Sequence, residues 1–323
     1  MHRRTFVSSC LTCGAHVLGL AHFSPTLIRK AFQAQDEEKI VAKEKWGRIE
    51  KISDGIFSLV STPFDTRDFT TVCNGGIIAG DKGVLAIESF MQPKGATWLA
   101  KQAKELTGKW PTDIVSTHFH GDHTTGHKGY FVDGNKPRVW LTESTRKAAE
   151  KSFDQRKMKD NQFQNVSTIE GQAELDLGNR KVKLINRSGH TDSDVTIEVV
   201  DPKVVWCGDL FFNRMFPNYG NAIPSRLEKY LADITANKDV TYVPGHGPIA
   251  DQEAMKRYKE LLEFVREAAT KAFKAGDEIN AVTKTFKLPE SLSAWTIWSP
   301  DNAKRAFQAW YKELGDKKES ASS

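Results

Sequence analysis

The chain of 323 residues is poor in cysteine, lacks repeated segments, and has only one weakly apolar stretch near its start. That stretch, about residues 5–21, is interrupted by polar side chains and is too polar to span a membrane. The absence of repeats at solenoid periods excludes a repeat architecture. Beyond residue 34 only Cys73 and Cys207 remain. Nothing in the sequence brings these two together, so we predict two free or buried thiols.

The formal net charge of +5 does not describe the body of the chain. Residues 1–34 contain four basic and no acidic residues, which leaves 42 basic against 41 acidic residues in the remainder. The chain also has no block of lysine and arginine interleaved with aromatic residues. We therefore expect no nucleic-acid partner. A hydrophobic content of 39% over this length is sufficient for one large core.

The first residues are typical of an export signal. Arg3 and Arg4 are paired and precede the weakly apolar stretch, a pattern that resembles a twin-arginine signal. Residues 1–34 are thus predicted to be an export signal and leader, with cleavage after Ala21 or Ala34. The twin-arginine machinery is then the expected partner during targeting. The mature chain would be periplasmic or otherwise exported, without a stable membrane anchor; the alternative is a disordered cytosolic leader.

The rest of the chain is predicted to be a charged, loose lead-in over residues 35–46 and a domain over residues 47–318 that ends in a helical extension. Apolar alternation and turn residues predict strands, and apolar residues at helical spacing predict helices. The expected strands cover residues 49–59 (a hairpin turning at Asp54-Gly55), 74–79, 83–88, 114–115, 181–185, 195–200 and 203–206. Three helices are expected. The first follows Pro93 and covers residues 96–106, and the other two cover residues 255–269 and 301–314.

Histidine is the residue type that points to a chemistry. Six histidines follow residue 34, and five of them combine with two aspartates on glycine-marked turns near predicted strands. The candidate metal ligands are His118, His120, Asp122, His123, His190, Asp209 and His246. Three imidazoles and a carboxylate within residues 118–123 would repel and desolvate one another in a core that held no cation. The sixth histidine, His127, lies just past the turn and is predicted to be structural.

The order His-x-His-x-Asp-His, then His, Asp and His, resembles the metallo-β-lactamase-fold hydrolase superfamily, in particular its glyoxalase II-like, exported members. The resemblance runs from about residue 47 to about residue 250. It implies an α/β fold, the αββα sandwich of two mixed β-sheets flanked by helices, with the metals at one open edge. It also implies two Zn²⁺ per chain. One zinc would bind His118, His120 and His190, the other would bind Asp122, His123 and His246, and Asp209 would bridge them.

Three positions discriminate within the superfamily. The main subclass of zinc β-lactamases carries a cysteine where Asp209 stands, and Cys207 lies two residues too early for that position. The oxygen-reducing diiron members carry glutamate at the position of His120, so histidine favours zinc over iron. Glu88 ends a predicted strand where family members commonly have aspartate, and we expect it to orient a metal ligand from behind.

This ligand set predicts a hydrolase. Two zinc ions a few ångströms apart can hold a bridging water whose pKa falls to about 7. Asp122 and Asp209 are the candidate catalytic carboxylates, and the sequence contains no Ser-His-Asp elbow that would compete with this scheme. The alternative is a non-hydrolytic metal protein, either an oxidoreductase or an accessory binding protein of an exported respiratory, sulfur or quinoprotein system.

The expected substrate is a small molecule, namely an ester, lactone, thioester or β-lactam. In this fold the loops around the metals decide the substrate. Two loops, over residues 62–69 and 211–219, combine aromatic residues with arginine and could hold an apolar, anionic molecule, with an arginine pairing its carboxylate. The candidate substrate-binding residues are Phe64, Arg67, Phe69, Phe212 and Arg214. The alternative is that these aromatics anchor their own loops in the core.

The export signal is open to a direct test. Replacing Arg3 and Arg4 together by lysine keeps the charge but removes the paired guanidinium groups. The precursor should then accumulate inside the cell, while the unaltered leader should carry a folded reporter out. Fractionation and immunoblotting measure both, and unchanged export of the double variant would point to the general secretory route.

Overall fold

The computed structural model describes residues 38–61, 68–158, 160–234, 239–293, 295–297 and 300–320. The chain divides into two compact units, Met1–Val41 and Ala42–Ser323. The predicted export signal, residues 1–34, lies outside the described residues. Among the helices of the described segments, none combines the length and apolar character that a membrane crossing requires.

Two mixed sheets form the centre of the described structure. The first has eight strands that follow one another in chain order. They are β1 (Ile40–Glu44), β2 (Gly47–Ser53), β3 (Ile56–Ser61), β4 (Gly75–Ala79), β5 (Val84–Ile87), β6 (Asp113–Val115), β7 (Arg138–Leu141) and β8 (Val166–Thr168). Strands β2 to β5 pair antiparallel, and β5 to β8 pair parallel. The parallel half leaves several strand ends at one edge, where loops can meet.

The second sheet has five strands in the order β13-β12-β11-β10-β9. Its strands are β9 (Gln172–Asp176), β10 (Lys181–Arg187), β11 (Asp194–Val199), β12 (Val204–Phe212) and β13 (Thr241–His246). Neighbours pair antiparallel from β9 to β12, whereas β12 and β13 are parallel. The register between β12 and β13 shifts on either side of Gly208, whose φ is +53°. That irregularity turns β12 just before Asp209.

The helices lie on the outer faces. They are α3 (Pro93–Thr107), α4 (Gly121–Thr124), α5 (Glu143–Gln155), α6 (Pro224–Ile234), α7 (Gln252–Ala275), α8 (Ile279–Thr285) and α9 (Pro300–Ser320), with short 3-10 turns η3 (His127–Tyr130) and η4 (Glu290–Leu292). Proline begins α3, and Gly108 ends it in the left-handed region. The side chains of Thr142 and Asp251 cap α5 and α7. Each accepts a hydrogen bond from the backbone N–H three residues later in the chain.

The alternation of side chains along the strands creates the layers. In β5, Leu85 and Ile87 enter the core between the sheets, while Val84 and Ala86 face the core under α3. In β12, Trp206 likewise enters the core between the sheets, while Cys207 belongs to the core under α6 and α7. The order is therefore helix, sheet, sheet, helix, which confirms the predicted αββα sandwich.

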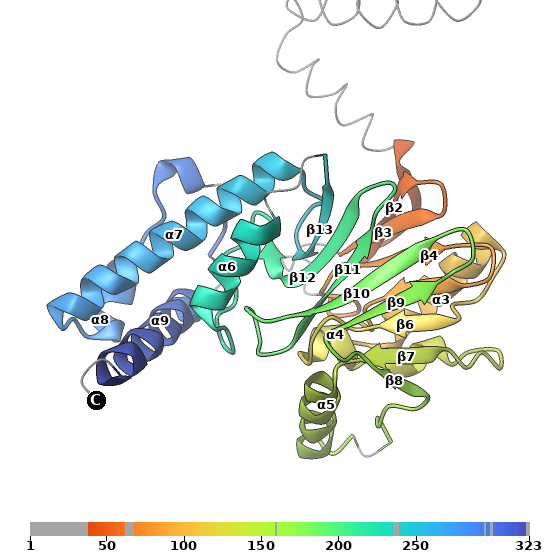
Figure 1. Cartoon of the computed structure of the whole chain (residues 1–323), viewed down its shortest axis with the longest axis horizontal. Coiled ribbons are helices and arrows are strands. Elements are labelled where there is room, and N and C mark those ends of the chain that lie inside the picture. The colour runs from red at the N-terminus through yellow and green to blue at the C-terminus, as the bar shows by residue number, and fades with distance from the viewer. Residues whose placement is uncertain are drawn as a thin grey trace, which may run out of the picture. The chain divides into compact units, whose positions relative to one another are not determined.

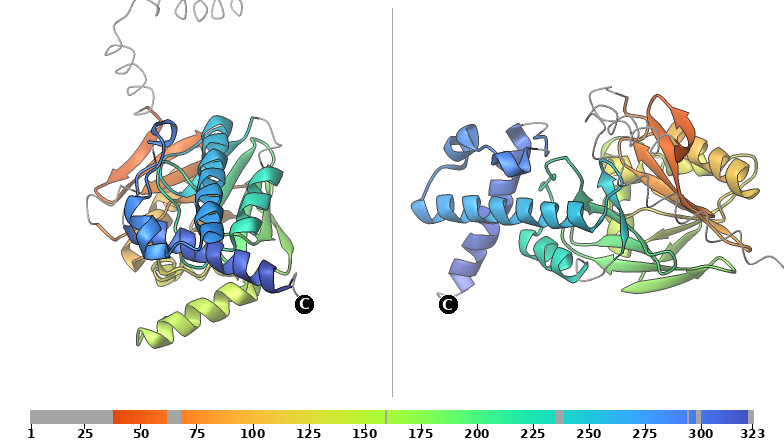
Figure 2. Two further views of the ribbon diagram at one scale, coloured as in Figure 1. Left: turned by 90° about the vertical axis from the view of Figure 1, so that its left-hand side faces the viewer. Right: turned by 90° about the horizontal axis from the view of Figure 1, so that it is seen from above.

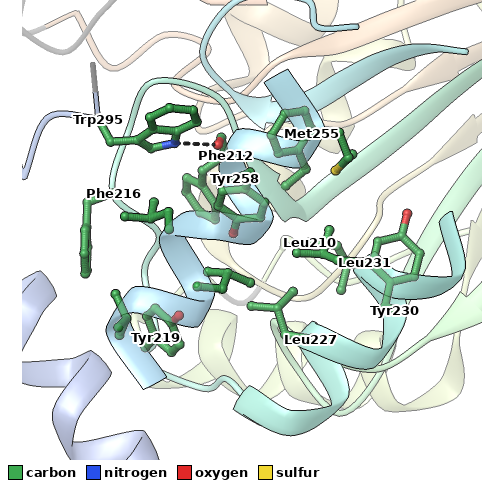
Figure 3. Close-up of a cluster of buried hydrophobic side chains, with 14 of the residues drawn as sticks. Leu210, Phe212, Phe216, Tyr219, Leu227, Tyr230, Leu231, Met255, Tyr258 and Trp295 are labelled. Carbon is green, nitrogen blue, oxygen red and sulfur yellow. Dashed lines mark hydrogen bonds between the residues drawn. The ribbon is translucent and has the colours of Figure 1, made fainter. Parts of the chain in front are cut away.

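The C-terminal helices pack on the outer side of the second sheet (Figure 1). Helix α7 contacts β12 and β13, and α9 packs against α7. Figure 2 shows α9 crossing α7. Tyr258 and Met255 of α7 share a core with Leu210 and Phe212 of β12 (Figure 3). Phe307 and Trp310 of α9 are buried in the same core. This extension is therefore joined to the sandwich by a continuous apolar core.

Most predicted elements are present, with two differences. The loose lead-in expected over residues 35–46 is wrong for residues 40–44, which form β1. The charged side chains of this segment did not predict a strand. It becomes one because its backbone pairs with β2 at the edge of the sheet. Strand β12 also extends six residues beyond Trp206, so Asp209 lies within a strand rather than after one. Cys73 and Cys207 are both buried and free, as predicted.

Candidate metal centre

Seven predicted ligands from four segments meet at one edge of the two sheets. His118 follows β6, His120 precedes α4, and Asp122 and His123 lie in α4. His190 is in the loop between β10 and β11, Asp209 is in β12, and His246 ends β13. They form two groups of close ligand atoms. The first group is His118, His120, His190 and Asp209, and the second group is Asp122, His123 and His246.

In the first group, three imidazole nitrogens converge. The Nδ1 atom of His120 lies 2.9 Å from Nε2 of His118 and 3.0 Å from Nε2 of His190. Oδ2 of Asp209 lies 3.3 Å from Nε2 of His190. Nitrogens that share one tetrahedral zinc at 2.0–2.1 Å would be separated by about 3.3 Å. The spacing is thus close to that of a common ion.

In the second group, a carboxylate joins two imidazoles. Oδ2 of Asp122 lies 3.5 Å from Nε2 of His123 and 3.4 Å from Nε2 of His246. The other oxygen of Asp209, Oδ1, lies 3.2 Å from each of these nitrogens. Asp209 therefore directs one oxygen to each group, which is the arrangement of a bridging carboxylate.

Two buried atoms at the centre show that the site fits a cation. Nε2 of His123 and Oδ1 of Asp209 are enclosed and have no hydrogen-bond partner. A buried polar atom without a partner costs about 1–3 kcal/mol, and such atoms are rare in folded proteins. A metal ion between them would satisfy both. The donor set of imidazole nitrogen and carboxylate oxygen is one that zinc accepts.

Electrostatics place His118, His190 and Asp209 in the protonation states that a metal needs, whereas nearby acidic groups outweigh burial and raise the pKa values of His123 and His246. Burial holds the pKa of His118 well below its ordinary value and lowers that of His190 to about 3. Both imidazoles are therefore neutral at pH 7. Burial opposes the ionised form of Asp209, but the neighbouring histidines, His246 first, hold its pKa well below the usual range. Neutral imidazole and ionised carboxylate are the metal-binding forms.

In two ligand imidazoles, the ring nitrogen that points away from the metal centre contacts an oxygen of the protein. Oε1 of Glu88 accepts hydrogen bonds from Nδ1 of His123 at 2.9 Å and from Oγ1 of Thr117 at 2.6 Å. The structure thus places Glu88 behind a ligand, where the sequence predicts it. Nδ1 of His246 lies 3.2 Å from the carbonyl oxygen of Val72. Such contacts leave Nε2 of each ring for a metal.

Asp194 holds the loop that carries His190, and the sequence reading missed it. Its Oδ2 accepts from the N–H groups of His190 (3.1 Å) and Thr191 (3.0 Å), and its Oδ1 accepts from N and Oγ1 of Thr191 (3.1 and 2.8 Å). An aspartate four residues after a ligand in a short loop was the available signal. A second missed residue is Asn221, whose Oδ1 lies 2.8 Å from Nε2 of His120.

Glycine makes the close approach of β13 to β12 possible. A Cβ atom at Gly245 would collide with Oδ1 of Asp209 and with the backbone of Gly208. Only glycine leaves space for the bridging carboxylate at this point. Glycine is therefore required at position 245 because any side chain there would overlap β12.

A family model described as the metallo-beta-lactamase superfamily matches residues 69–246. The chain belongs to the metallo-β-lactamase superfamily. Beta-lactamase-like protein 2 homolog of Caenorhabditis elegans is 22% identical over 240 residues, which make up 68% of this chain and 74% of that protein. Metallo-beta-lactamase type 2 of Bacillus sp. (strain 170) is 23% identical over 256 residues, 76% of this chain and 95% of that protein.

Solved structures agree on the fold. A metallo-beta-lactamase from Pontibacter korlensis matches with a TM-score of 0.56 and 19% identity, covering 67% of this chain and 99% of that one. A stereoselective inverting sec-alkylsulfatase from Pseudomonas sp. matches with a TM-score of 0.64 and 14% identity, covering 83% of this chain and 50% of that one. Superfamily membership and the His/Asp cluster together support a metal-dependent hydrolase.

A cavity of about 260 Å³ opens on the metal centre of this superfamily member. Its lining combines ligands from both groups with side chains from the loop after β12 and from α9. These residues are His120, Asp122, Asp209, Phe212, Met215, Phe216, Asn218, His246 and Asn302. Four of them, Met215, Phe216, Asn218 and Asn302, were not predicted as site residues. No sequence pattern links α9 to the histidines.

The predicted substrate residues have separate outcomes. Phe64 and Arg67 lie outside the described residues. The side chain of Phe69 is 49% exposed and does not line the cavity. Phe212 lines the cavity and stacks on the ring of His246, with centroids 5.1 Å apart and planes at 14°. Arg214 is exposed and does not line the cavity, so the prediction that it grips the substrate there is not supported.

His127 is separate from the ligands. It is buried, its Nδ1 lies 3.1 Å from the carbonyl oxygen of Thr124, and its ring packs on Phe163. His118→Ala should therefore reduce metal affinity at least about 100-fold, while His127→Ala should keep the metal content of the folded protein. Elemental analysis of both purified variants, with thermal melting as a check on folding, measures this. Equal metal loss would contradict the assignment.

Asp194→Asn tests the loop contact. Asparagine offers one acceptor oxygen where Asp194 uses two, so His190 should lose its fixed position. We expect zinc affinity at the first group to fall about 10- to 100-fold while the second group is less affected. Competition with a chromogenic chelator measures both affinities. The matched control is Asp192→Asn, an exposed carboxylate in the same loop, and equal effects of the two changes would refute a specific role of Asp194.

Proposed function

We propose that this chain is a dizinc hydrolase that cleaves a small ester, lactone, thioester or β-lactam. The observation that carries the proposal is the carboxylate of Asp209, which directs Oδ2 to the first group and Oδ1 to the second. A carboxylate that faced a single ion would not need both oxygens directed at separate sets of nitrogens. This geometry supports two ions rather than one.

The donor set supports zinc. Five imidazoles and two carboxylates are borderline ligands that suit a tetrahedral or five-coordinate divalent ion. When bound, a pair of zinc ions would lower the pKa of a water molecule to about 7 and polarise a carbonyl oxygen. The protein's own contribution is to hold the ligands rigidly, through Glu88 behind His123 and Asp194 behind the His190 loop.

The carboxylates differ in their exposure. The side chain of Asp122 is 20% exposed and lines the cavity, whereas that of Asp209 is 4% exposed. We assign Asp209 to holding the two groups together and Asp122 to the cavity side, where it can exchange a proton with a bound molecule. The ring of Phe212 covers one face of His246 and excludes water from it.

We also propose that the hydrolase acts outside the cytoplasm. The paired Arg3 and Arg4 ahead of a weakly apolar stretch support export through the twin-arginine route. That route carries folded proteins, which suits a chain whose ligands come from four separate segments. A small-molecule substrate that reaches the exported protein by diffusion agrees with the size of the cavity.

Asp209→Ala tests both the metal number and the reaction. We expect about two zinc ions in the unaltered protein, and in the variant the second group should lose zinc more readily than the first, which keeps three imidazoles. Hydrolysis should fall by more than about 100-fold, in line with the cost of disturbing metal ligands. Elemental analysis and a panel of chromogenic esters, lactones and a cephalosporin provide the measurements.

Cys207→Ser is the matched control, because Cys207 lies in the same strand but faces the core under α6 and α7. It should retain both zinc ions and most of the activity. Two results would overturn the proposal: an iron majority in the purified protein, or a variant series in which Cys207→Ser loses metal and Asp209→Ala keeps it.

A further inference from the structure

Two carboxamides lie in the wall of the cavity although they are far apart in the sequence. Asn218 belongs to the loop between β12 and α6, and Asn302 belongs to the first turns of α9. Phe212, Met215 and Phe216 line the same cavity. The wall therefore offers hydrogen-bonding groups of no net charge beside an apolar surface.

The orientation of Asn218 is set by its neighbours. Its Oδ1 accepts a hydrogen bond from the N–H of Gly220 at 3.1 Å and another from Nη1 of Arg305 at 3.1 Å. With the oxygen occupied by two donors, Nδ2 is the group that remains to donate. Arg305 lies one turn after Asn302 in α9, so this helix both supplies one amide and orients the other.

The apolar part of the wall is also tied to the C-terminal segment. The carbonyl oxygen of Phe212 accepts a hydrogen bond from Nε1 of Trp295 at 3.2 Å (Figure 3). The N–H of Phe216 donates to the carbonyl oxygen of Thr296 at 3.0 Å, and the N–H of Thr296 donates to that of Arg214. The loop over residues 212–216 is therefore held in place by the segment that leads to α9.

Size and charge limit what this wall can accept. The cavity of about 260 Å³ has the volume of roughly nine water molecules at about 30 Å³ each, which suits a small molecule. Of the described residues that line it, those outside the two metal groups are Phe212, Met215, Phe216, Asn218 and Asn302. A carboxylate placed against them would lose its hydration and gain only neutral donors.

We propose that the cavity binds an uncharged, mainly apolar part of the substrate that carries one hydrogen-bond acceptor. Asn218 donates to that acceptor from Nδ2, Asn302 is the second specificity-determining amide, and Arg305 is a positioning residue for Asn218. This assignment rests on the proposed hydrolase function, and it differs from the anionic substrate expected from the sequence, for which Arg67 lies outside the described residues. The substrate class is then a neutral ester, lactone or thioester rather than a carboxylated one.

Three hydroxamates of equal chain length test the proposal on the purified, zinc-loaded protein. The monohydroxamate of suberic acid ends in a carboxylate, its primary amide is uncharged and nearly isosteric, and octanohydroxamic acid is fully apolar at that end. Isothermal titration calorimetry measures the three dissociation constants. We expect the amide to bind about 10-fold tighter than the carboxylate, the difference that one favourable hydrogen bond and an avoided desolvation produce.

Variants then assign the contact to residues. Asn302→Leu and Arg305→Met should each weaken the amide ligand about 5- to 10-fold, as expected for one hydrogen bond, while octanohydroxamic acid binds as before. The ratio of these two affinities within one variant separates recognition from a general structural effect. Gln308→Leu is the matched control, because Gln308 is an exposed amide in the same helix that does not line the cavity.

The outcomes separate this proposal from the proposed reaction. Tighter binding of the carboxylate, no binding of any of the three ligands, or an equal change of the affinity ratio in Asn302→Leu and Gln308→Leu would each overturn it. If the ligands bind in the expected order but no ester, lactone, thioester or β-lactam is hydrolysed, the hydrolase proposal fails and the cavity assignment stands.

Discussion

A single buried carboxylate, Asp209, is the constraint on which the rest of the structure depends. Its two oxygens lie within 3.3 Å of nitrogens from three different segments, and its ionised form is stable only because those imidazoles surround it. Two strands must approach closely to bring this about. The absence of a side chain at Gly245 and the bulge at Gly208 allow that approach. A buried charge without such partners would cost several kcal/mol.

The sandwich explains why the ligand geometry can be rigid. The ligands follow β6 and β10, lie within β12 and end β13, and each of these strands places side chains in the core between the sheets. Hydrogen bonds accepted by Glu88, Asp194 and the carbonyl oxygen of Val72 then hold individual rings or loops. Rings that are held from behind do not need to reorganise when a metal binds, and this preorganisation is what metal affinity and catalysis both require.

The metal centre and the cavity wall have different origins in the chain. The ligands and the loop over residues 212–218 lie within the region that matches the superfamily model, whereas Asn302 of α9 lies beyond it. The segment at residues 295–296 holds that loop in place. The continuous apolar core that joins α9 to α7 and β12 makes this wall a fixed part of the domain.

The sequence by itself determined the fold family and the candidate ligands, because imidazoles and carboxylates at short fixed spacing, such as His118 to His123, have few other physical explanations. It also predicted that Glu88 supports a ligand, from its place in the family resemblance, and that His127 is structural, from its position just past the motif. Only the tertiary structure decided which oxygen of Asp209 faces which group, since this depends on how β12 and β13 approach each other. The same holds for Asp194 and for the wall of the cavity. Asn218, Asn302 and Arg305 carry no local pattern, whereas the sequence favoured Arg214, which packing places at the surface. Contacts between segments about 90 residues apart are set by the packing of helices on a sheet, which no spacing along the chain encodes.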